Sequence, residues 1–398
     1  MKPATKANKK PHGRKAFFLV IPLGLEERAQ IELTEWTMVL ATAFGEEALL
    51  YNVEMVKGGI EFEVGEQVGL LLNYVLKLPS RILQRVHSFK TRDWPVVENE
   101  LRTVNWKSYF PQGVQDFEIA ASESRINNEK HLRTFLEEKF EGRHYQKSPQ
   151  GTVAYLRVHD NQFTLSRDTS GEHLHFRGYR QQQGEAPLRE NLAAFLWSML
   201  IKDQSRLNAQ EALIIDPFVG SGTVLMEAVL WNQVVSSRTS SIPFASTPWI
   251  SKESWLRFER VRERLQPWSL SLVGVDSNAE VLGKARANFA TKAQGGSVDF
   301  VNEDSVSKQN PNWLPKDKPV WLISNPPYGG KGRLKSELSW RALWEGALVR
   351  YQPVWAVALG PERECHKGDR LAHWHCVETQ RFLNGGLRVV ASVWKRQS

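Results

Sequence analysis

The sequence feature that most constrains the fold is a regular alternation of apolar runs and helical segments from about Glu190 onward. Strands are predicted at five apolar runs, residues 213–218, 272–276, 298–304, 320–325 and 354–360. Helices are predicted at Thr223–Trp231, about Ala279–Ala293 and about Ser336–Tyr351. Continuous apolar strands separated by helices are typical of a parallel sheet that is covered on both faces. This part of the chain is therefore expected to be an α/β domain.

Two more strands are predicted near the C-terminal end, in the segment VETQRFLNGGLRVVASVWK at residues 377–395. They meet at Asn384-Gly385-Gly386, which is a strong signal for a tight hairpin. The domain is thus expected to hold a mostly parallel sheet of about seven strands, closed by an antiparallel hairpin.

The N-terminal part is less regular. Residues 1–15 are basic and are interpreted as a flexible tail, whereas strand-like and helical patches alternate irregularly over residues 16–170. Such alternation favours an α+β module with a mixed sheet. The second domain is expected to span residues 171–398, and its stretch 234–265 is interpreted as an insertion with its own helix.

A glycine-rich turn, Asp216-Pro217-Phe218-Val219-Gly220-Ser221-Gly222-Thr223, follows the first strand of the α/β domain. Ligands bind outside the carboxyl ends of parallel strands, and glycines let the backbone approach them closely. The helix that begins at Thr223 favours a carboxylate at its N-terminus. The spacing matches neither a dinucleotide motif nor a P-loop. It suits S-adenosylmethionine, whose methionine moiety carries a carboxylate.

Two further acids end strands at the same edge. Asp276 is placed to accept hydrogen bonds from ribose hydroxyls, and Asp304 from an adenine amino group. A single Asp at such a position more often caps the following helix. Three strand-end acids in register, Asp216 included, favour a cofactor site.

The tetrapeptide Asn325-Pro326-Pro327-Tyr328 follows the fourth strand. An exocyclic amine on a base is a poor nucleophile, because its lone pair is delocalised into the ring. Acceptors on the Asn325 side chain and the Pro326 carbonyl are suited to hold its two N–H groups and direct the lone pair at a methyl sulfonium. The prolines keep the loop rigid, and Tyr328 is placed to stack on an extruded base. The alternative is a strand that merely ends in a Pro-Pro turn with a buried Tyr.

Several segments resemble the THUMP-domain guanine-N2 RNA methyltransferases, in particular the bacterial enzymes that act on large-subunit ribosomal RNA. The resemblance lies in DTSGEHLHFRGYRQQQGEAPLREN (168–191), DPFVGSGTVLMEA (216–228), SNPPYG (324–329) and RFLNGGLRV (381–389). It is weaker in FFLVIPLGLEE (17–27) and RVHSFKTRDW (85–94). The resemblance implies a Rossmann-like class I methyltransferase domain preceded by a ferredoxin-like and THUMP module. It also implies an S-adenosylmethionine-dependent enzyme that methylates N2 of guanine, with roles in RNA binding and ribosomal RNA processing.

Motifs and resemblance together assign the site residues. Cofactor binding is expected of Pro187, Asp216, Phe218, Gly220, Ser221, Gly222, Thr223, Asp276, Ser277, Asp304, Ser305 and Asn325. Catalysis is expected of Asn325, Pro326, Pro327 and Tyr328. The resemblance also places the segment Ala186–Glu190 along the cofactor pocket.

Charge and composition are compatible with an RNA partner. The formal net charge is +8, and an excess of positive charge suits a polyanion without proving one. Basic residues that could contact phosphates are Lys130, His131, Arg133, Lys139, Arg143, His144 and Lys147, although each alone is as readily part of a solvated helix face. The two cysteines form no CxxC pair and no apolar run is long enough to span a bilayer, so no metal and no membrane partner are expected.

The protein is therefore expected to be a cytoplasmic monomer. Three alternatives stay open at this stage: transfer RNA as the substrate, methylation of adenine N6 in DNA, and an inactive RNA-binding or ribosome assembly factor.

Overall fold

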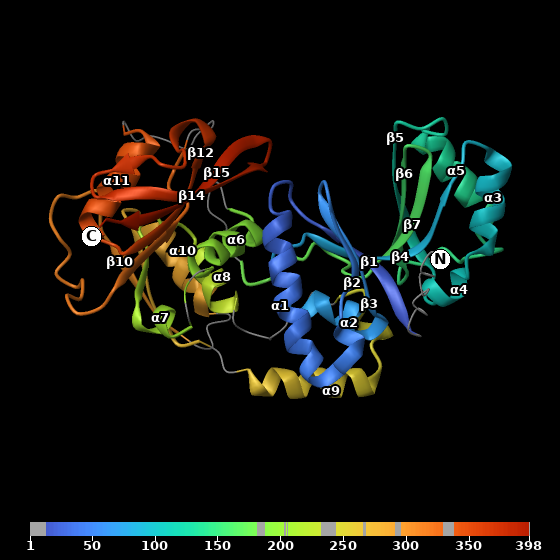
Figure 1. The fold of residues 1–398 in the computed structure, drawn as a ribbon, viewed down its shortest axis with the longest axis horizontal. Coiled ribbons are helices and arrows are strands. Elements are labelled where there is room, and N and C mark those ends of the chain that lie inside the picture. The colour runs from blue at the N-terminus through green and yellow to red at the C-terminus, as the bar shows by residue number, and fades with distance from the viewer. Residues whose placement is uncertain are drawn as a thin grey trace, which may run out of the picture.

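The computed structural model describes residues 13–180, 188–202, 204, 206–231, 244–265, 268–290, 296–328 and 338–397. The molecule is elongated, with the C-terminal domain at one end and an N-terminal module in the middle and at the other end (Figure 1). Two sheets organise it, one of seven strands in the module and one of eight in the C-terminal domain.

The seven-stranded sheet has the order β2-β3-β1-β4-β7-β6-β5. It is mixed, as predicted, because β5 and β6 run parallel whereas the other neighbours are antiparallel. Its strands are β1 (Arg14–Val20), β2 (Tyr51–Val56), β3 (Gly59–Gly65), β4 (Arg81–Lys90), β5 (Val114–Ser122), β6 (Thr152–His159) and β7 (Gln162–Asp168). Strand β1 thus already contains Arg14 and Lys15, which the sequence analysis assigned to the tail.

The central strand β4 divides this module into two halves with separate cores. The inner half consists of β1–β3, α1 (Glu26–Phe44) and α2 (Glu66–Leu71). The outer half consists of β5–β7, α3 (Trp94–Thr103), α4 (Trp106–Tyr109) and α5 (Glu129–Phe140). Ile82 of β4 belongs to a core that continues into the C-terminal domain, whereas Phe89 of the same strand belongs to the core of the outer half. The inner half is therefore packed as part of the C-terminal domain.

The C-terminal sheet has the order β10-β9-β8-β11-β12-β15-β14-β13. Its strands are β8 (Leu213–Asp216), β9 (Leu270–Asp276), β10 (Gly296–Asn302), β11 (Val320–Ser324), β12 (Trp355–Pro361), β13 (Arg370–Leu371), β14 (Trp374–Asn384) and β15 (Leu387–Arg396). The first five in spatial order are parallel, and β15 joins them antiparallel. The Rossmann-like class I arrangement is confirmed, with the two-residue β13 as an additional edge strand.

The C-terminal hairpin forms where it was predicted. Asn384 pairs with Leu387 across a two-residue turn of Gly385 and Gly386, whose φ values are 57° and 84°. Two positive φ angles define the type I′ turn that matches the twist of antiparallel strands, and glycine adopts them without strain.

Helices cover both faces of this sheet: α6 (Glu190–Ile201), α7 (Arg206–Glu211), α8 (Thr223–Trp231), α10 (Ala279–Ala290) and α11 (Trp340–Tyr351). Helix α11 begins at Trp340 rather than near Ser336, and the Oγ of its N-cap Ser339 accepts a hydrogen bond from the Ala342 N–H at 3.2 Å. Helix α6 is buried from Glu190 to Leu200, because it packs on the sheet and on α8, and its Asn191 donates to the Leu78 carbonyl of the module at 3.3 Å.

The expected insertion carries the expected helix, α9 (Lys252–Arg264), and its described part begins at Phe244. Figure 1 shows α9, in yellow, beneath α1 and α2 of the inner half. The Arg257 guanidinium donates to the Ala43 carbonyl at 2.8 Å and lies 4.4 Å from the Phe44 ring centroid. The Tyr74 hydroxyl lies 2.8 Å from Thr247 Oγ1. Residues 244–265 therefore form a clasp that holds the inner half against the C-terminal domain.

The linker between module and domain contains a buried ion pair. Arg177 Nη2 lies 3.5 Å from Glu227 Oε2 in α8 and donates to the Lys77 carbonyl at 2.7 Å. The Tyr179 hydroxyl donates to Glu227 Oε1 at 3.0 Å. Since both charged side chains are fully buried, the pair ties linker, module and domain together in a water-free contact.

Candidate active site

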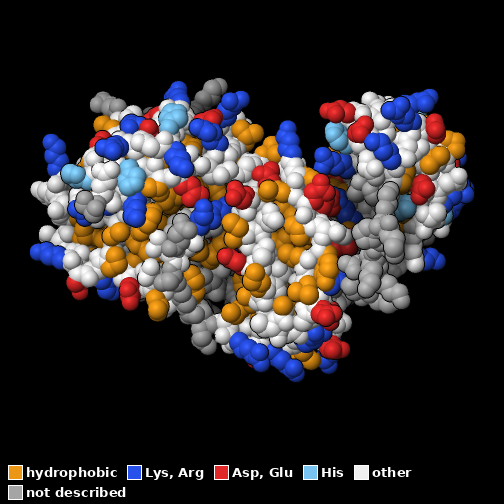
Figure 2. Space-filling model, viewed as in Figure 1, with side chains coloured by type: hydrophobic (Ala, Val, Ile, Leu, Met, Phe, Trp, Pro, Cys, Tyr) orange, Lys and Arg blue, Asp and Glu red, His pale blue; other side chains and the backbone are white. Residues whose placement is uncertain are grey.

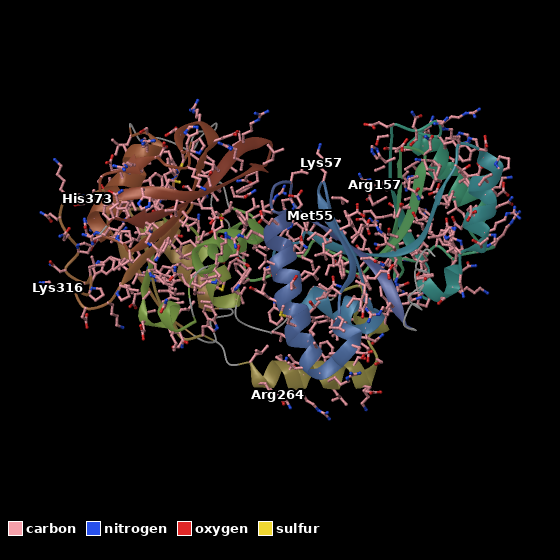
Figure 3. The ribbon with its side chains drawn as sticks, in the orientation of Figure 1. Met55, Lys57, Arg157, Arg264, Lys316 and His373 are labelled. Atoms are coloured by element: carbon pink, nitrogen blue, oxygen red, sulfur yellow. The ribbon has the colours of Figure 1, made fainter. Side chains whose placement is uncertain are left out.

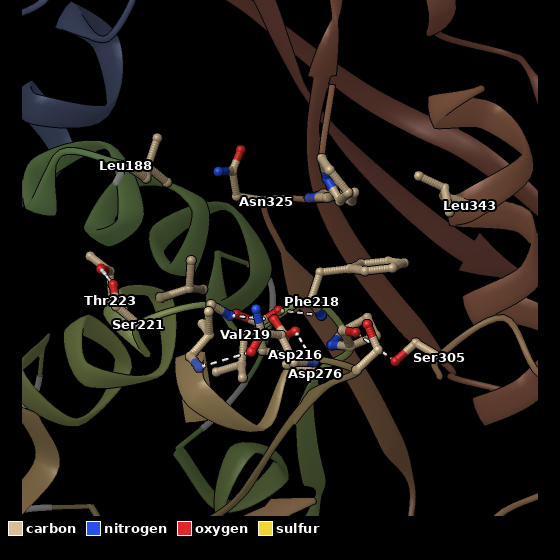
Figure 4. A pocket seen from close by; sticks show the side chains of 18 of the residues that line it. Leu188, Asp216, Phe218, Val219, Ser221, Thr223, Asp276, Ser305, Asn325 and Leu343 are labelled. Carbon is tan, nitrogen blue, oxygen red and sulfur yellow. Dashed lines mark hydrogen bonds between the residues drawn. The ribbon is translucent and has the colours of Figure 1, made fainter. Parts of the chain in front are cut away.

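A cavity of about 740 Å³ opens at the carboxyl ends of β8, β9 and β11. It is lined by the glycine loop, the segments after β9 and β10, the tetrapeptide after β11, and Leu188, Leu338 and Leu343 (Figure 4). This is where an open α/β sheet places its ligand. Its walls combine carboxylates with apolar side chains, as suits a ligand that has both polar and ring moieties.

The two glycines of the loop differ in role. Both have positive φ, 53° for Gly220 and 84° for Gly222. A Cβ added to Gly220 would meet nothing within 4 Å, whereas one on Gly222 would lie 3.0 Å from a ring carbon of Phe289 in α10. Gly220 lines the cavity and Gly222 does not. Gly220 thus leaves room for a ligand, and Gly222 lets the loop pack on α10.

Asp276 holds the glycine loop in place. Its Oδ2 accepts a hydrogen bond from the Gly220 N–H at 3.1 Å, and its Oδ1 accepts one from the Asn278 N–H at 2.9 Å. Burial raises the pKa of Asp276 above its ordinary range. The following helix is capped by Asn278, whose Oδ1 accepts from the Glu280 N–H at 2.9 Å. Asp276 is therefore not the cap of that helix, and lone pairs of its carboxylate remain for a ligand.

Asp216 is buried at the bottom of the cavity. Its Oδ1 accepts from Ser324 Oγ at 2.5 Å and from the Phe218 N–H at 3.1 Å, whereas its Oδ2 has no partner among the described residues. Burial is the main reason that the pKa of Asp216 rises to about 7, and the nearby Asp276 adds to the rise. A buried carboxylate oxygen without a partner is costly, so it marks a place for a donor or a cation.

Ser305 braces the opposite wall. Its hydroxyl donates to the Pro217 carbonyl at 2.5 Å and lies 3.1 Å from the Tyr351 hydroxyl. Its neighbour Asp304 is exposed and accepts from the Val306 N–H at 3.1 Å. Asp304 thus orders its own turn and keeps a solvent-facing oxygen at the rim of the cavity.

The tetrapeptide forms the upper wall of the cavity in Figure 4. The Asn325 Oδ1 is buried and makes no hydrogen bond within the described part of the chain. Tyr328 is 6% exposed, and its hydroxyl accepts a hydrogen bond from Asn384 Nδ2 at 3.3 Å. The site therefore offers the Asn325 Oδ1 as an acceptor for a ligand's donor, next to the Tyr328 ring, which Asn384 of the β14–β15 hairpin contacts.

The structure brings most of the sequence-predicted site residues together. Those that line the cavity are Asp216, Phe218, Gly220, Ser221, Thr223, Asp276, Ser277, Asp304, Ser305, Asn325, Pro326, Pro327 and Tyr328. Gly222 lies behind the cavity wall, and Pro187 lies outside the described residues. Their roles in binding and catalysis stay predictions.

Sequence analysis missed several residues of the site. Ser324 was quoted only as the start of its motif, although it bonds to Asp216. Glu280 and Lys284 line the cavity from α10, where they form an ion pair of 3.0 Å. Their four-residue spacing on a helix that follows a strand-end acid is a signal that was present and unused.

Neither a metal centre nor a membrane segment is seen in the described residues. No group of three or more His, Cys, Asp or Glu side chains there could hold a metal ion. None of the helices in those ranges is both long and apolar enough to cross a bilayer.

Comparison with protein families gives a match over residues 177–372, to the family described as "RMKL-like, methyltransferase domain". A curated relative from Aeromonas hydrophila, "Ribosomal RNA large subunit methyltransferase K/L", is 28% identical in an alignment of 379 positions that covers 87% of this chain and 50% of the relative. The chain spans about half the length of the curated relatives it matches.

Solved structures share the fold over nearly the whole chain. One from Listeria monocytogenes, described as a predicted N6-adenine-specific DNA methylase, has a TM-score of 0.75 at 20% identity and covers 96% of this chain and 97% of its own. Another, SMU.472, a methyltransferase complexed with SAH, has a TM-score of 0.73 at 20% identity over 98% of this chain and 100% of its own. At this identity the likeness establishes the fold alone.

Proposed function

We propose that the chain transfers a methyl group from S-adenosylmethionine to the exocyclic N2 amine of guanine in large-subunit ribosomal RNA, because its residues 177–372 match the RMKL-like methyltransferase domain family. The observation that carries this proposal is the buried, unpartnered Oδ1 of Asn325 beside the cofactor-sized cavity. The names of the curated relatives support the choice of RNA.

The residues of the cavity fit S-adenosylmethionine. The open space over Gly220 admits a ligand against the backbone, and the unpartnered Oδ2 of Asp216 is an acceptor for its ammonium group. Asp276 and Asp304 keep oxygens for the ribose and the adenine amine. When bound, this cofactor supplies an electrophilic methyl group on a positively charged sulfur.

Asn325 is proposed to activate the target amine by orienting it. A buried acceptor costs free energy until a donor arrives, so the Asn325 Oδ1 favours an N–H group at that position. With one N–H held there and the other at the Pro326 carbonyl, the amine pyramidalises and its lone pair points into the cavity. The amine nitrogen becomes acidic once it is methylated and loses a proton to solvent, so no strong base is required.

The outer half of the N-terminal module is proposed to be the THUMP-type RNA-binding part. Of the basic residues singled out above, Arg133 is paired with Asp116 at 2.6 Å and Lys147 with Glu137 at 3.7 Å. Lys130, Lys139 and Arg143 are exposed. Figure 2 shows Lys and Arg side chains spread over both ends of the molecule, so charge alone does not select one RNA-binding face.

The first experiment is mass spectrometry of nucleosides from ribosomal and transfer RNA, comparing a deletion strain with its parent. We expect N2-methylguanosine to disappear from large-subunit ribosomal RNA and to return when the wild-type protein is supplied. Loss from transfer RNA instead would change the substrate and keep the chemistry. No change in any RNA nucleoside would reject the proposal and direct the search to DNA N6-methyladenine or to RNA binding without catalysis.

The same proposal includes a cytoplasmic location and a monomeric state. Light scattering coupled to size-exclusion chromatography tests the second, and a mass of twice the 45.5 kDa chain would overturn it.

A further inference from the structure

A second cavity, of about 600 Å³, borders Tyr328 as the cofactor cavity does. Among the described residues, Tyr328 alone lines both of them. The other described residues that line the second cavity are Pro361, Glu362, Arg363, His366, Arg381, Leu387, Arg388 and Val389. The ring proposed to meet the target base thus borders two spaces, of which the sequence analysis anticipated only one.

The lining of this second cavity is basic. Its described residues include three arginines, Arg363, Arg381 and Arg388, against one acid, Glu362. Glu362 is engaged by Arg381, with 3.0 Å between Oε1 and Nε. Arg363 and Arg388 are exposed and take part in no ion pair within the described ranges. Two guanidinium groups are therefore available to an anion.

The scaffold of these arginines is rigid and connected to Tyr328. Arg388 of β15 pairs with Leu383 of β14. The next residue of β14 is Asn384, whose side-chain amide donates to the Tyr328 hydroxyl. Arg363 lies in the short 3-10 helix that directly follows β12. Because β12 and β15 are paired, the sheet positions both arginines at the cavity that Tyr328 also lines.

We propose that this basic cavity binds the phosphates of the RNA strand next to the target nucleotide. The proposal rests on the proposed function, because it needs a base in the pocket beside Tyr328. An extruded base stays bonded to its sugar and phosphates, so these groups must lie within one nucleotide of the ring. Guanidinium groups bind phosphate oxygens with paired, charge-assisted hydrogen bonds. The half-exposed Leu387 lines the same cavity and offers an apolar contact for a ribose.

The test compares wild type with the double variant Arg363→Gln and Arg388→Gln. In vitro transcribed large-subunit ribosomal RNA is the probe, and its affinity is measured by filter binding over a series of KCl concentrations. The slope of log K against log salt is negative, and each lost phosphate contact on a single strand reduces its magnitude by about 0.7, so the double variant should show a magnitude smaller by about 1.4. Its KM for RNA should rise roughly tenfold or more, with kcat within about twofold.

Arg264→Gln is the matched control. Arg264 is an exposed arginine at the end of α9, which lies at the bottom of the molecule in Figure 3, away from the β14–β15 hairpin. Calorimetric titration with S-adenosylmethionine should give the same Kd for all variants, and thermal unfolding should show that they are folded. A salt slope and KM equal to those of the control would overturn the phosphate site. So would an unchanged slope together with a weaker Kd for the cofactor.

Failure of the proposed function would look different. If wild type transferred no methyl group to RNA, the binding slopes would still separate the double variant from the control. A slope difference that appeared with single-stranded DNA and not with RNA would overturn the assignment to RNA.

Discussion

The Ser324 hydroxyl donates to Oδ1 of Asp216 across 2.5 Å, and both side chains are buried. Ser324 ends β11 and Asp216 ends β8, two neighbouring parallel strands. This contact therefore connects the strand before the glycine loop with the strand before the catalytic tetrapeptide, underneath the cavity that the two segments share.

Replacement of Ser324 by Ala should destabilise the protein, because it removes a donor from a buried carboxylate. A hydrogen bond to a charged group is worth about 1.5–3 kcal/mol, and the loss should be seen in urea unfolding at pH 8. The pKa of Asp216 should rise further, because the Ser324 bond lowers it. Unfolding free energy equal to that of wild type would contradict this role. Ser307→Ala serves as the control, because Ser307 is only partly buried and its hydroxyl accepts a long hydrogen bond of 3.4 Å from the Gln309 N–H.

The stability of the protein should depend on the titration of Asp216. Its pKa is about 7 in the folded state against an ordinary value of 3.8, so the folded state binds the proton more tightly. Its contribution to the unfolding free energy is then greatest below pH 3.8 and is lost as pH rises through 7. The variant Asp216→Asn should gain stability relative to wild type between pH 5 and 8. A pH-independent difference between the two would show that Asp216 titrates normally.

Asn325→Ala should abolish turnover while it leaves binding intact. Loss of a preorganised acceptor in a water-excluded site lowers kcat by about 10²–10³-fold. The affinity for RNA should stay within about twofold of wild type, measured by filter binding. Asn325→Asp keeps an acceptor oxygen and should retain more activity than Asn325→Ala. Equal activity in both variants would contradict the proposed role of Asn325 in orienting the amine.

Substitutions at Tyr328 should separate its ring from its hydroxyl. Tyr328→Ala removes the stacking surface, which is worth about 1–3 kcal/mol per base, so KM for RNA should rise about 5- to 150-fold. Tyr328→Phe keeps the ring and loses the 3.3 Å contact between the hydroxyl and Asn384. Its KM should resemble that of Asn384→Ala and lie close to wild type. If Phe proved as damaging as Ala, the hydroxyl and not the ring would matter.

Removal of one partner of the linker's buried ion pair should strongly lower the unfolding free energy, whereas replacement of both partners should change it little. Arg177→Met leaves Glu227 charged and uncompensated, which typically costs about 3–5 kcal/mol. The double variant Arg177→Met and Glu227→Gln should recover most of that loss in thermal unfolding. An additive loss in the double variant would show that the two side chains act independently.

Much of the C-terminal domain could be predicted, because its local signals agree with the final fold. The apolar runs that end at Asp216 and Asp276 are strands, and the Asn384-Gly385-Gly386 turn is a hairpin. Asp216 and Asp276 end neighbouring strands at one sheet edge, because parallel strands share their direction. Asp304, in contrast, does not end a strand as predicted, because β10 ends at Asn302. The order of strands, in contrast, has no local signal and came only with the structure.

Contacts between distant segments could not be predicted. Tyr328 and Asn384 are 56 residues apart, and nothing in the sequence near either one indicates the other. The same is true of Arg177 and Glu227, whose burial as a pair depends on how the linker crosses α8. Gly222 was expected to approach the ligand, yet its position is set by the ring of Phe289. Periodicity reports the faces of elements, whereas these relationships depend on how the elements pack.

The clasp of residues 244–265 leaves the C-terminal domain after α8, packs against α1 and Tyr74, and returns to β9. With the shared core and the Arg177 ion pair, it prevents the inner half from swinging relative to the catalytic pocket. The outer half, which is proposed to bind RNA, continues from this fixed inner half through the shared strand β4. Under the proposed function, the protein should therefore select its guanine by the distance from a bound RNA feature as well as by the identity of the base. Insertion of one base pair between that RNA feature and the target guanine should then abolish methylation of an otherwise intact RNA.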